Sequence, residues 1–205
     1  MGVGSRPDSS APGPMSAPTA VPTPSTFWRD RLVHRFAAVA GLAMLADLGT
    51  KALAVRLLGT SGYVDLTERL AFFLVWNTGV TGGVSVGPFT ASINVLVTVL
   101  ALWLVLTVVR PMAQVDARAT LALGMVTGGA LGNLASIVAG PPGVADFIAV
   151  RLSADSTMVA NVADLFLWGG ALMLAPVALT LLRLVREERA AQLRVLRANP
   201  SQNPM

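Results

Sequence analysis

Four long apolar runs alternate with shorter polar segments along the chain. They cover approximately residues 34–58, 91–109, 118–139 and 160–182. Each run is roughly 17 to 25 residues long, which is enough to cross a hydrocarbon core about 30 Å thick as a helix. The pattern therefore predicts a membrane protein of the all-α class with four transmembrane helices.

Two segments between these runs have a different pattern. The stretch "LAFFLVW" at 70–76 is typical of a β-strand, and Asn77 and the glycines after it predict a turn. After the third run, "GPPG" at 140–143 stops the helix, and "VADFIAV" at 144–150 alternates like a short extended segment. We expect a small extracytoplasmic β element over the outer ends of the helices, with a plain hairpin as the alternative.

The arginines predict the orientation in the membrane. They gather before the first run, around the 110–118 turn and after the fourth run, whereas the loops at 59–90 and 140–159 hold only Arg69 and Arg151. The positive-inside rule then places both termini and the 110–118 turn in the cytoplasm. Although the net charge is +4, no basic patch interleaved with aromatic residues indicates nucleic-acid binding.

The chain ends predict tails on either side of the membrane domain. Residues 1–33 are expected to be a disordered cytoplasmic tail, because Pro, Ser, Ala and Gly dominate its first 26 positions. Residues 34–185 form the predicted membrane domain, and 186–205 a cytoplasmic C-terminal tail. The first run is too long and too interrupted by charge for a cleaved signal peptide.

Composition limits the available chemistry. The chain is 54% hydrophobic and 13% charged, with no cysteine and a single histidine, His34. Disulfides, thiolate metal sites and histidine-ligated metal sites are therefore excluded, and we expect neither a metal nor a cofactor. Any catalysis has to use carboxylates, hydroxyls or amides.

Two aspartates are predicted at the same membrane depth. Asp146 follows the "GPPG" break, and Asp164 falls in the first turn of the fourth span, where Asn161 is the expected N-cap. A solvated loop acid and a plain helix N-terminal acid are the simpler interpretations. If the carboxylates are close, however, one keeps its proton while the other acts as a base, which is how aspartic proteases activate water.

Further polar residues lie inside the predicted spans. Asp47 and Lys51 share one face of the first helix, either as a mutual ion pair or as part of a wet cavity. In the third span, Asn133 follows closely spaced glycines that allow helices to approach one another.

Taken together, residues 34–185 resemble the signal peptidase II family of lipoprotein signal peptidases. Five motifs in chain order carry the resemblance: Asp47-Leu48-Gly49-Thr50-Lys51, Asn77-Thr78-Gly79, Gly128-Gly129-Ala130-Leu131-Gly132-Asn133-Leu134, Val144-Ala145-Asp146-Phe147 and Asn161-Val162-Ala163-Asp164. The resemblance implies four spans with an extracytoplasmic β-cradle and an aspartyl endopeptidase acting as a monomer in the inner membrane of a bacterial cell. It also implies a substrate, a diacylglyceryl-modified prolipoprotein that is cut before its lipidated cysteine at the surface of the membrane lipid.

The resemblance also implies roles for individual residues. Asp146 and Asp164 would be the catalytic pair. The remaining motif residues would bind substrate or support the site: Asp47, Lys51, Asn77, Gly79, Asn133 and Asn161. The chain departs from the family at Ser136-Ile137, where an Asp-Arg pair is usual, and after Asn77-Thr78-Gly79. A catalytically inert paralogue that binds precursors or membrane partners is therefore the main alternative, and a small transporter is another.

Overall fold

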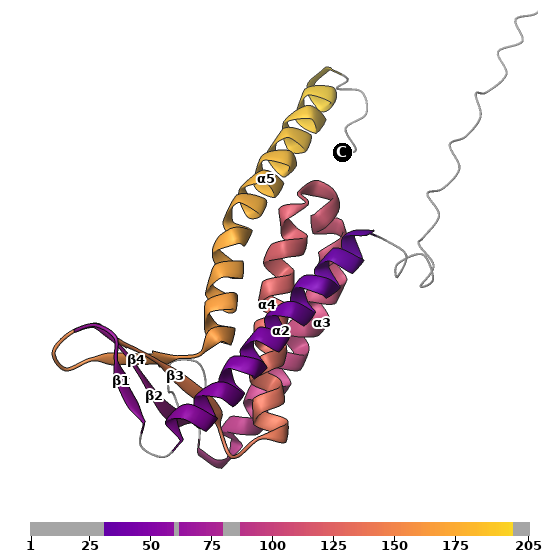
Figure 1. Ribbon diagram of the computed structural model, residues 1–205. Helices are drawn as coiled ribbons and strands as arrows, with labels where there is room; N and C mark the ends of the chain where they lie inside the picture. The colour runs from indigo at the N-terminus through magenta and orange to yellow at the C-terminus, as the bar shows by residue number, and fades with distance from the viewer. Residues whose placement is uncertain (1–30, 60–61, 80–86, 199–205) are drawn as a thin grey trace, which may run out of the picture.

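A computed structural model describes residues 31–59, 62–79 and 87–198 as a helical bundle with a small sheet at one end (Figure 1). Within these residues, four helices are long and apolar enough to cross a membrane. This confirms the predicted fold class. The elements in chain order are α2 (Arg31–Leu58), β1 (Tyr63–Asp65), β2 (Leu70–Asn77), η1 (Gly87–Phe89), α3 (Thr90–Val115), α4 (Arg118–Ala139), β3 (Val144–Arg151), β4 (Thr157–Ala160) and α5 (Val162–Ala198).

The helices run alternately in opposite directions. The start of α2, the α3–α4 turn and the end of α5 lie at one end of the bundle, and the sheet lies at the other (Figure 1). This arrangement is the one that the predicted orientation requires, although the side of the membrane remains a prediction. The final helix has 37 residues, so it is about 55 Å long at 1.5 Å per residue and exceeds the hydrocarbon core.

The helix boundaries differ from the predicted domain limits at three points. Helix α2 begins at Arg31, and the predicted tail up to residue 30 lies outside the described residues. Helix α5 begins at Val162, because Thr157–Ala160 pairs as a strand before it. The predicted C-terminal tail continues α5 as a helix through Ala198.

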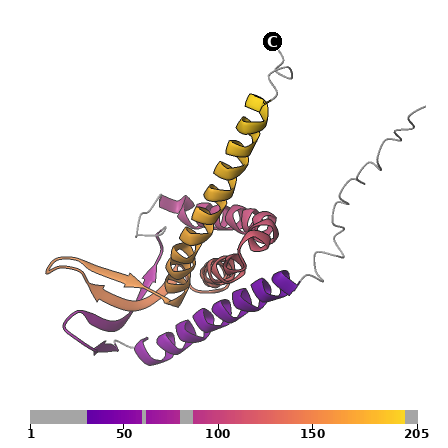
Figure 2. The same cartoon turned by 90° about the horizontal axis from the view of Figure 1, so that it is seen from above.

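Helix α4 is the centre of the bundle and contacts the other three helices; Figure 2 shows it from above. Its glycines make this possible. A Cβ at Gly128 would lie 2.5 Å from the Ala40 carbonyl oxygen of α2, and one at Gly129 would lie 2.6 Å from the Ala163 carbonyl oxygen of α5. The backbone of α4 therefore approaches two helices, as the predicted small-residue packing requires. Helix α3 instead exposes most of its apolar side chains, as expected for contact with lipid.

The sheet is antiparallel throughout, in the order β1-β2-β3-β4. Strands β2 and β3 confirm the two predicted extended segments, whereas β1 and β4 were not predicted. Gly143, immediately before β3, has a φ of +106°, a conformation that residues with side chains disfavour. A Cβ there would also lie 2.9 Å from the Asn77 carbonyl oxygen of β2. The "GPPG" break thus ends α4 and lets β3 lie against β2.

The close packing of α4 predicts that Gly128→Ala destabilises the protein by about 1 to 3 kcal/mol, because the added methyl group overlaps α2. Gly41→Ala is the matched control: its Cβ would meet nothing within 4 Å, and alanine favours a helix over glycine by about 1 kcal/mol. Thermal unfolding of the purified variants in detergent measures both. Equal unfolding temperatures would contradict the packing of α4.

Candidate active site

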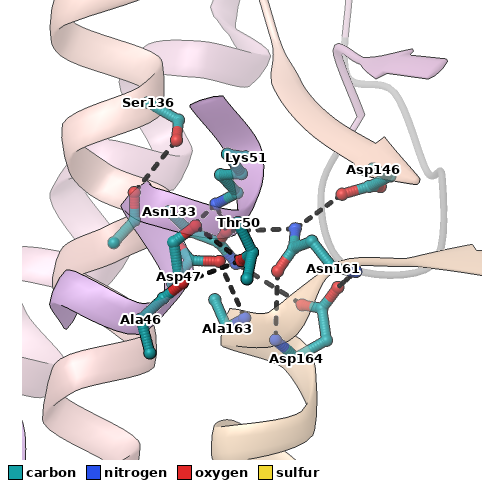
Figure 3. Close-up of polar contacts among 11 residues, drawn as sticks. Ala46, Asp47, Thr50, Lys51, Asn133, Ser136, Asp146, Asn161, Ala163 and Asp164 are labelled. Carbon is teal, nitrogen blue, oxygen red and sulfur yellow. Dashed lines mark hydrogen bonds and ion pairs between the residues drawn. The ribbon is translucent and has the colours of Figure 1, made fainter. Parts of the chain in front are cut away.

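The start of α5 is held by a reciprocal pair of hydrogen bonds. The Asp164 backbone N–H donates to Asn161 Oδ1 at 3.1 Å, and the Asn161 backbone N–H donates to Asp164 Oδ2 at 3.0 Å. This is a capping box, in which the N-cap and N3 side chains satisfy each other's N–H groups. It confirms Asn161 as the N-cap and fixes the Asp164 carboxylate at the N-terminus of α5 (Figure 3).

The same Asn161 side chain reaches the second predicted aspartate. Its Nδ2 donates to Asp146 Oδ1 at 2.6 Å, and Asn77 Nδ2 donates to Asp146 Oδ2 at 2.9 Å. Asp146, on β3, is buried to 4% exposure, so it is not the solvated loop acid of the simpler interpretation. One asparagine therefore binds both carboxylate-bearing residues, which lie eighteen positions apart in the sequence (Figure 3).

Asp47 and Lys51 form a buried ion pair with Nζ and Oδ2 2.7 Å apart. Lys51 Nζ also donates to Asn133 Oδ1 at 2.6 Å. The other Asp47 oxygen, Oδ1, accepts the backbone N–H of Ala163 at 2.8 Å. Of the two interpretations of these residues, the structure shows the ion pair, and its hydrogen bonds extend to α4 and to the first turn of α5.

Asn133 connects this ion pair with the two aspartates. Its Oδ1 also accepts Asn161 Nδ2 at 3.2 Å, and its Nδ2 donates to Asp164 Oδ1 at 3.4 Å. Gly132 beside it has to be glycine, because a Cβ would collide with the Asp47 carboxylate. The glycine-rich motif of α4 thus packs two helices and makes space for a charged group.

Asn77 and Gly79 form the turn that was predicted after β2. Asn77 Oδ1 accepts the Gly79 backbone N–H at 2.9 Å, while its Nδ2 is held by Asp146. Asn94 of α3 donates to the Gly79 carbonyl oxygen at 3.2 Å. Asn94 belongs to none of the five sequence motifs. Its partner is distant in sequence, so no local pattern indicated that it holds this turn.

One of the sequence departures, at Ser136, lies on α4 close to Asn133 (Figure 3). Ser136 Oγ donates to the Gly132 carbonyl oxygen of its own helix at 3.0 Å (Figure 3). The hydroxyl therefore binds the backbone of α4 and not a carboxylate of the site. The glycines at 82 and 83, where the second departure falls, lie outside the described residues.

The environment of Asp146 favours its protonated form. Burial raises the pKa of Asp146 above its ordinary value, and the negative charge of Asp164 raises this pKa further, while the amides of Asn77 and Asn161 and the charge of Lys51 oppose the shift. The site can therefore keep a proton next to a second carboxylate. Among the described residues, no group of three or more His, Cys, Asp or Glu side chains could hold a metal ion.

The raised pKa of Asp146 gives a pH dependence of stability. A group with a raised folded-state pKa stabilises the protein below its ordinary pKa and loses that contribution as the pH rises through the folded-state value. Between about pH 4 and about pH 7, the unfolding temperature of Asp146→Asn should therefore rise relative to wild type. Thermal unfolding in detergent measures this difference. A difference that stays constant over the range would contradict the shift.

The buried ion pair gives a second prediction. Asp47→Ala should destabilise the protein by about 3 to 5 kcal/mol, because it leaves Lys51 charged, buried and without its carboxylate. Asp47→Ala/Lys51→Met should recover part of this loss, since no unpaired charge remains. Chemical unfolding of the single and double variants forms the test, and additive losses would show that the two groups act independently.

Comparisons with known proteins agree with this geometry. The family model described as signal peptidase (SPase) II matches residues 39–180. No curated protein matches the chain. Two solved structures share the fold, both described as bacterial membrane enzymes determined by the in meso method, at 2.3 Å and 1.9 Å resolution.

The first structure is 20% identical with a TM-score of 0.63, and the alignment covers 72% of this chain and 88% of that one. The second is 21% identical with a TM-score of 0.61, covering 72% and 93%. At this identity they show the fold alone. The family match spans more than half of the chain, so this protein belongs to the signal peptidase II family of membrane-integral aspartic peptidases.

Proposed function

We propose that Asp146 and Asp164 are the catalytic pair of this lipoprotein signal peptidase. The observation that supports the proposal most directly is Asn161, whose side-chain amide binds Asp146 and the backbone of Asp164. The two aspartates lie on β3 and in the first turn of α5, and Asn161 links them at the sheet end of the bundle. Here a peptide anchored in the bilayer by its lipid would reach the carboxylates.

The chemistry follows from the different environments of the two groups. The protonated Asp146 donates a hydrogen bond to the scissile carbonyl oxygen, and Asp164 takes a proton from a water molecule that attacks the carbonyl carbon. The tetrahedral intermediate collapses when the leaving nitrogen receives a proton from the pair. The products are a signal peptide with a new carboxylate and a protein that begins with the free amine of the lipidated cysteine.

The other residues hold this pair in place. Asn77 and Asn161 bind Asp146, and Asn133 lies between Asp164 and the Lys51 ammonium group. Lys51 is only 5% exposed and its Nζ already has two partners. We assign Lys51 to the support of the network, together with Asp47, and Gly79 to the turn that orients Asn77.

The proposal also covers the substrate, the oligomeric state and the membrane location of the enzyme. The substrate is a prolipoprotein that carries diacylglycerol on the cysteine after the cleaved bond. The enzyme acts as a monomer in the bacterial inner membrane, with both termini in the cytoplasm and the sheet outside. Two observations support this orientation: the distribution of the arginines, and the position of the start of α2, the α3–α4 turn and the end of α5 at one end of the bundle (Figure 1).

Asp146→Asn and Asp164→Asn should each lower cleavage of a lipidated precursor by at least about a thousandfold, because neither variant can move a proton through the pair. Asp155→Asn is the matched control, since Asp155 is exposed in the β3–β4 turn. Release of the signal peptide is measured in proteoliposomes of purified protein. Wild-type turnover by either site variant would refute the pair.

The family match does not favour the inert paralogue, for which Ser136 and Ile137 were the argument. The same assay tests it directly. A wild-type protein that binds the lipidated precursor and never releases a signal peptide would establish the inert alternative.

A further inference from the structure

The hydrogen bonds at the end of the sheet determine which way each backbone group of β4 points. In an antiparallel strand, the N–H and C=O of one residue point to the same side, and successive residues alternate. The Arg151 N–H donates to the Arg69 carbonyl oxygen at 2.8 Å, toward β2. The Leu152 N–H donates to the Ser156 carbonyl oxygen at 2.8 Å, on the opposite side.

The alternation fixes the rest of the β3–β4 ladder. Val150 pairs with Met158, and Ile148 pairs with Ala160. These residues are in phase with Leu152 and Ser156, so Met158 and Ala160 direct their backbone groups toward β3. It follows that Thr157 and Val159 direct theirs away from the sheet.

Among residues 31–59, 62–79 and 87–198, nothing pairs with this outward edge. No hydrogen bond in the described part of the chain uses the backbone N–H or C=O of Thr157 or Val159. Thr157 is exposed and Val159 is half-buried. An open edge is a template for pairing with another extended chain.

The edge leads to the proposed catalytic pair. Asn161 is the next residue in phase with Thr157 and Val159, and its outward N–H is bound by Asp164 Oδ2 at 3.0 Å. The Asp164 carboxylate therefore lies at the end of the same row of outward backbone groups. A strand that pairs with Val159 would bring its own main chain to this carboxylate.

We propose that the outward edge of β4 binds the extended backbone of the precursor's signal peptide as a fifth strand of the sheet, with main-chain hydrogen bonds to Val159. The inference rests on the proposed function and adds a binding mode to it. Main-chain pairing of this kind recognises an extended conformation with little demand on side chains. The lipid on the cysteine would then set the position of the cut, and β4 would align the peptide in front of it.

The other edge of the sheet does not offer the same geometry. The Leu66 N–H donates to the Leu70 carbonyl oxygen at 2.9 Å, so Val64 faces β2 in register, while Asp65 directs its backbone groups outward. Strand β1 is three residues long, and β2 and β3 separate it from β4. This edge therefore provides the control.

The test replaces one outward N–H at each edge by proline, which edge strands tolerate where the N–H faces outward. Val159→Pro should lower kcat/KM for the lipidated precursor by about tenfold, mainly through KM, as expected for the loss of one main-chain hydrogen bond. Asp65→Pro should stay within about twofold of wild type. Equal kcat/KM for Val159→Pro and Asp65→Pro would overturn the proposal.

A substrate series tests the same pairing without changing the protein. Synthetic lipidated precursors carry a single N-methyl group at successive backbone positions before the cysteine. Strand pairing predicts alternation, with about tenfold losses at every second position and small effects between them. A uniform loss, or none, would overturn the proposal even if Val159→Pro failed to fold.

Binding separates this inference from the proposed function. The dissociation constants of the same peptides for the full-length Asp146→Asn variant should alternate in the same way. Alternation in binding without cleavage by wild type would retain the β4 site and refute the peptidase function. Cleavage that depends on Asp164, without alternation in binding, would retain the peptidase function and refute the β4 site.

Discussion

The first turn of α5 has backbone N–H groups that must find partners where the helix starts among buried groups. Unsatisfied N–H groups are costly in such surroundings. The Ala163 N–H is bound by Asp47 from α2, and those of Asn161 and Asp164 are bound within the capping box. The candidate site is built around this helix start, because the residues that satisfy it also hold the two aspartates.

The charges of the site explain why a proton is expected there. Asp47, Asp146 and Asp164 surround one cation, Lys51. Lys51 neutralises Asp47 directly, at 2.7 Å, and is linked to Asp164 through the amide of Asn133. Two carboxylates then share a poorly solvated region, so one of them holds its proton more strongly than an aspartate in water. An aspartic peptidase requires this condition, and here it follows from packing.

The amides give the site its connectivity. Asn161 and Asn133 each use both ends of the side chain, so each links groups from different elements. An ionised aspartate only accepts hydrogen bonds and a leucine side chain does neither, so neither residue could take the place of these amides. This explains why asparagines recur in the motifs, and why the glycines of α4 are needed to bring the elements within hydrogen-bond distance.

Much of the fold was readable in the sequence because its signals are local. The apolar runs predicted the four helices, the "GPPG" break predicted the end of α4, and Asn161 with Asp164 formed a recognisable helix start. The family motifs also selected the residues that gather at the site. Strands β1 and β4 were missed because three- and four-residue strands have too little periodicity to be distinguished from loops.

By itself, the sequence determined the membrane class, the number of helices and the identity of the polar residues, since each depends on a run or motif within one segment. Only the tertiary structure decided that Asp47 binds the Ala163 N–H, that Asn94 holds Gly79 and that the outward backbone groups following β4 end at the Asp164 carboxylate. The physical reason is that these interactions join backbone groups to partners from other elements. Backbone N–H and C=O groups are the same in nearly every residue, so only the three-dimensional arrangement determines which of them are paired and which remain free.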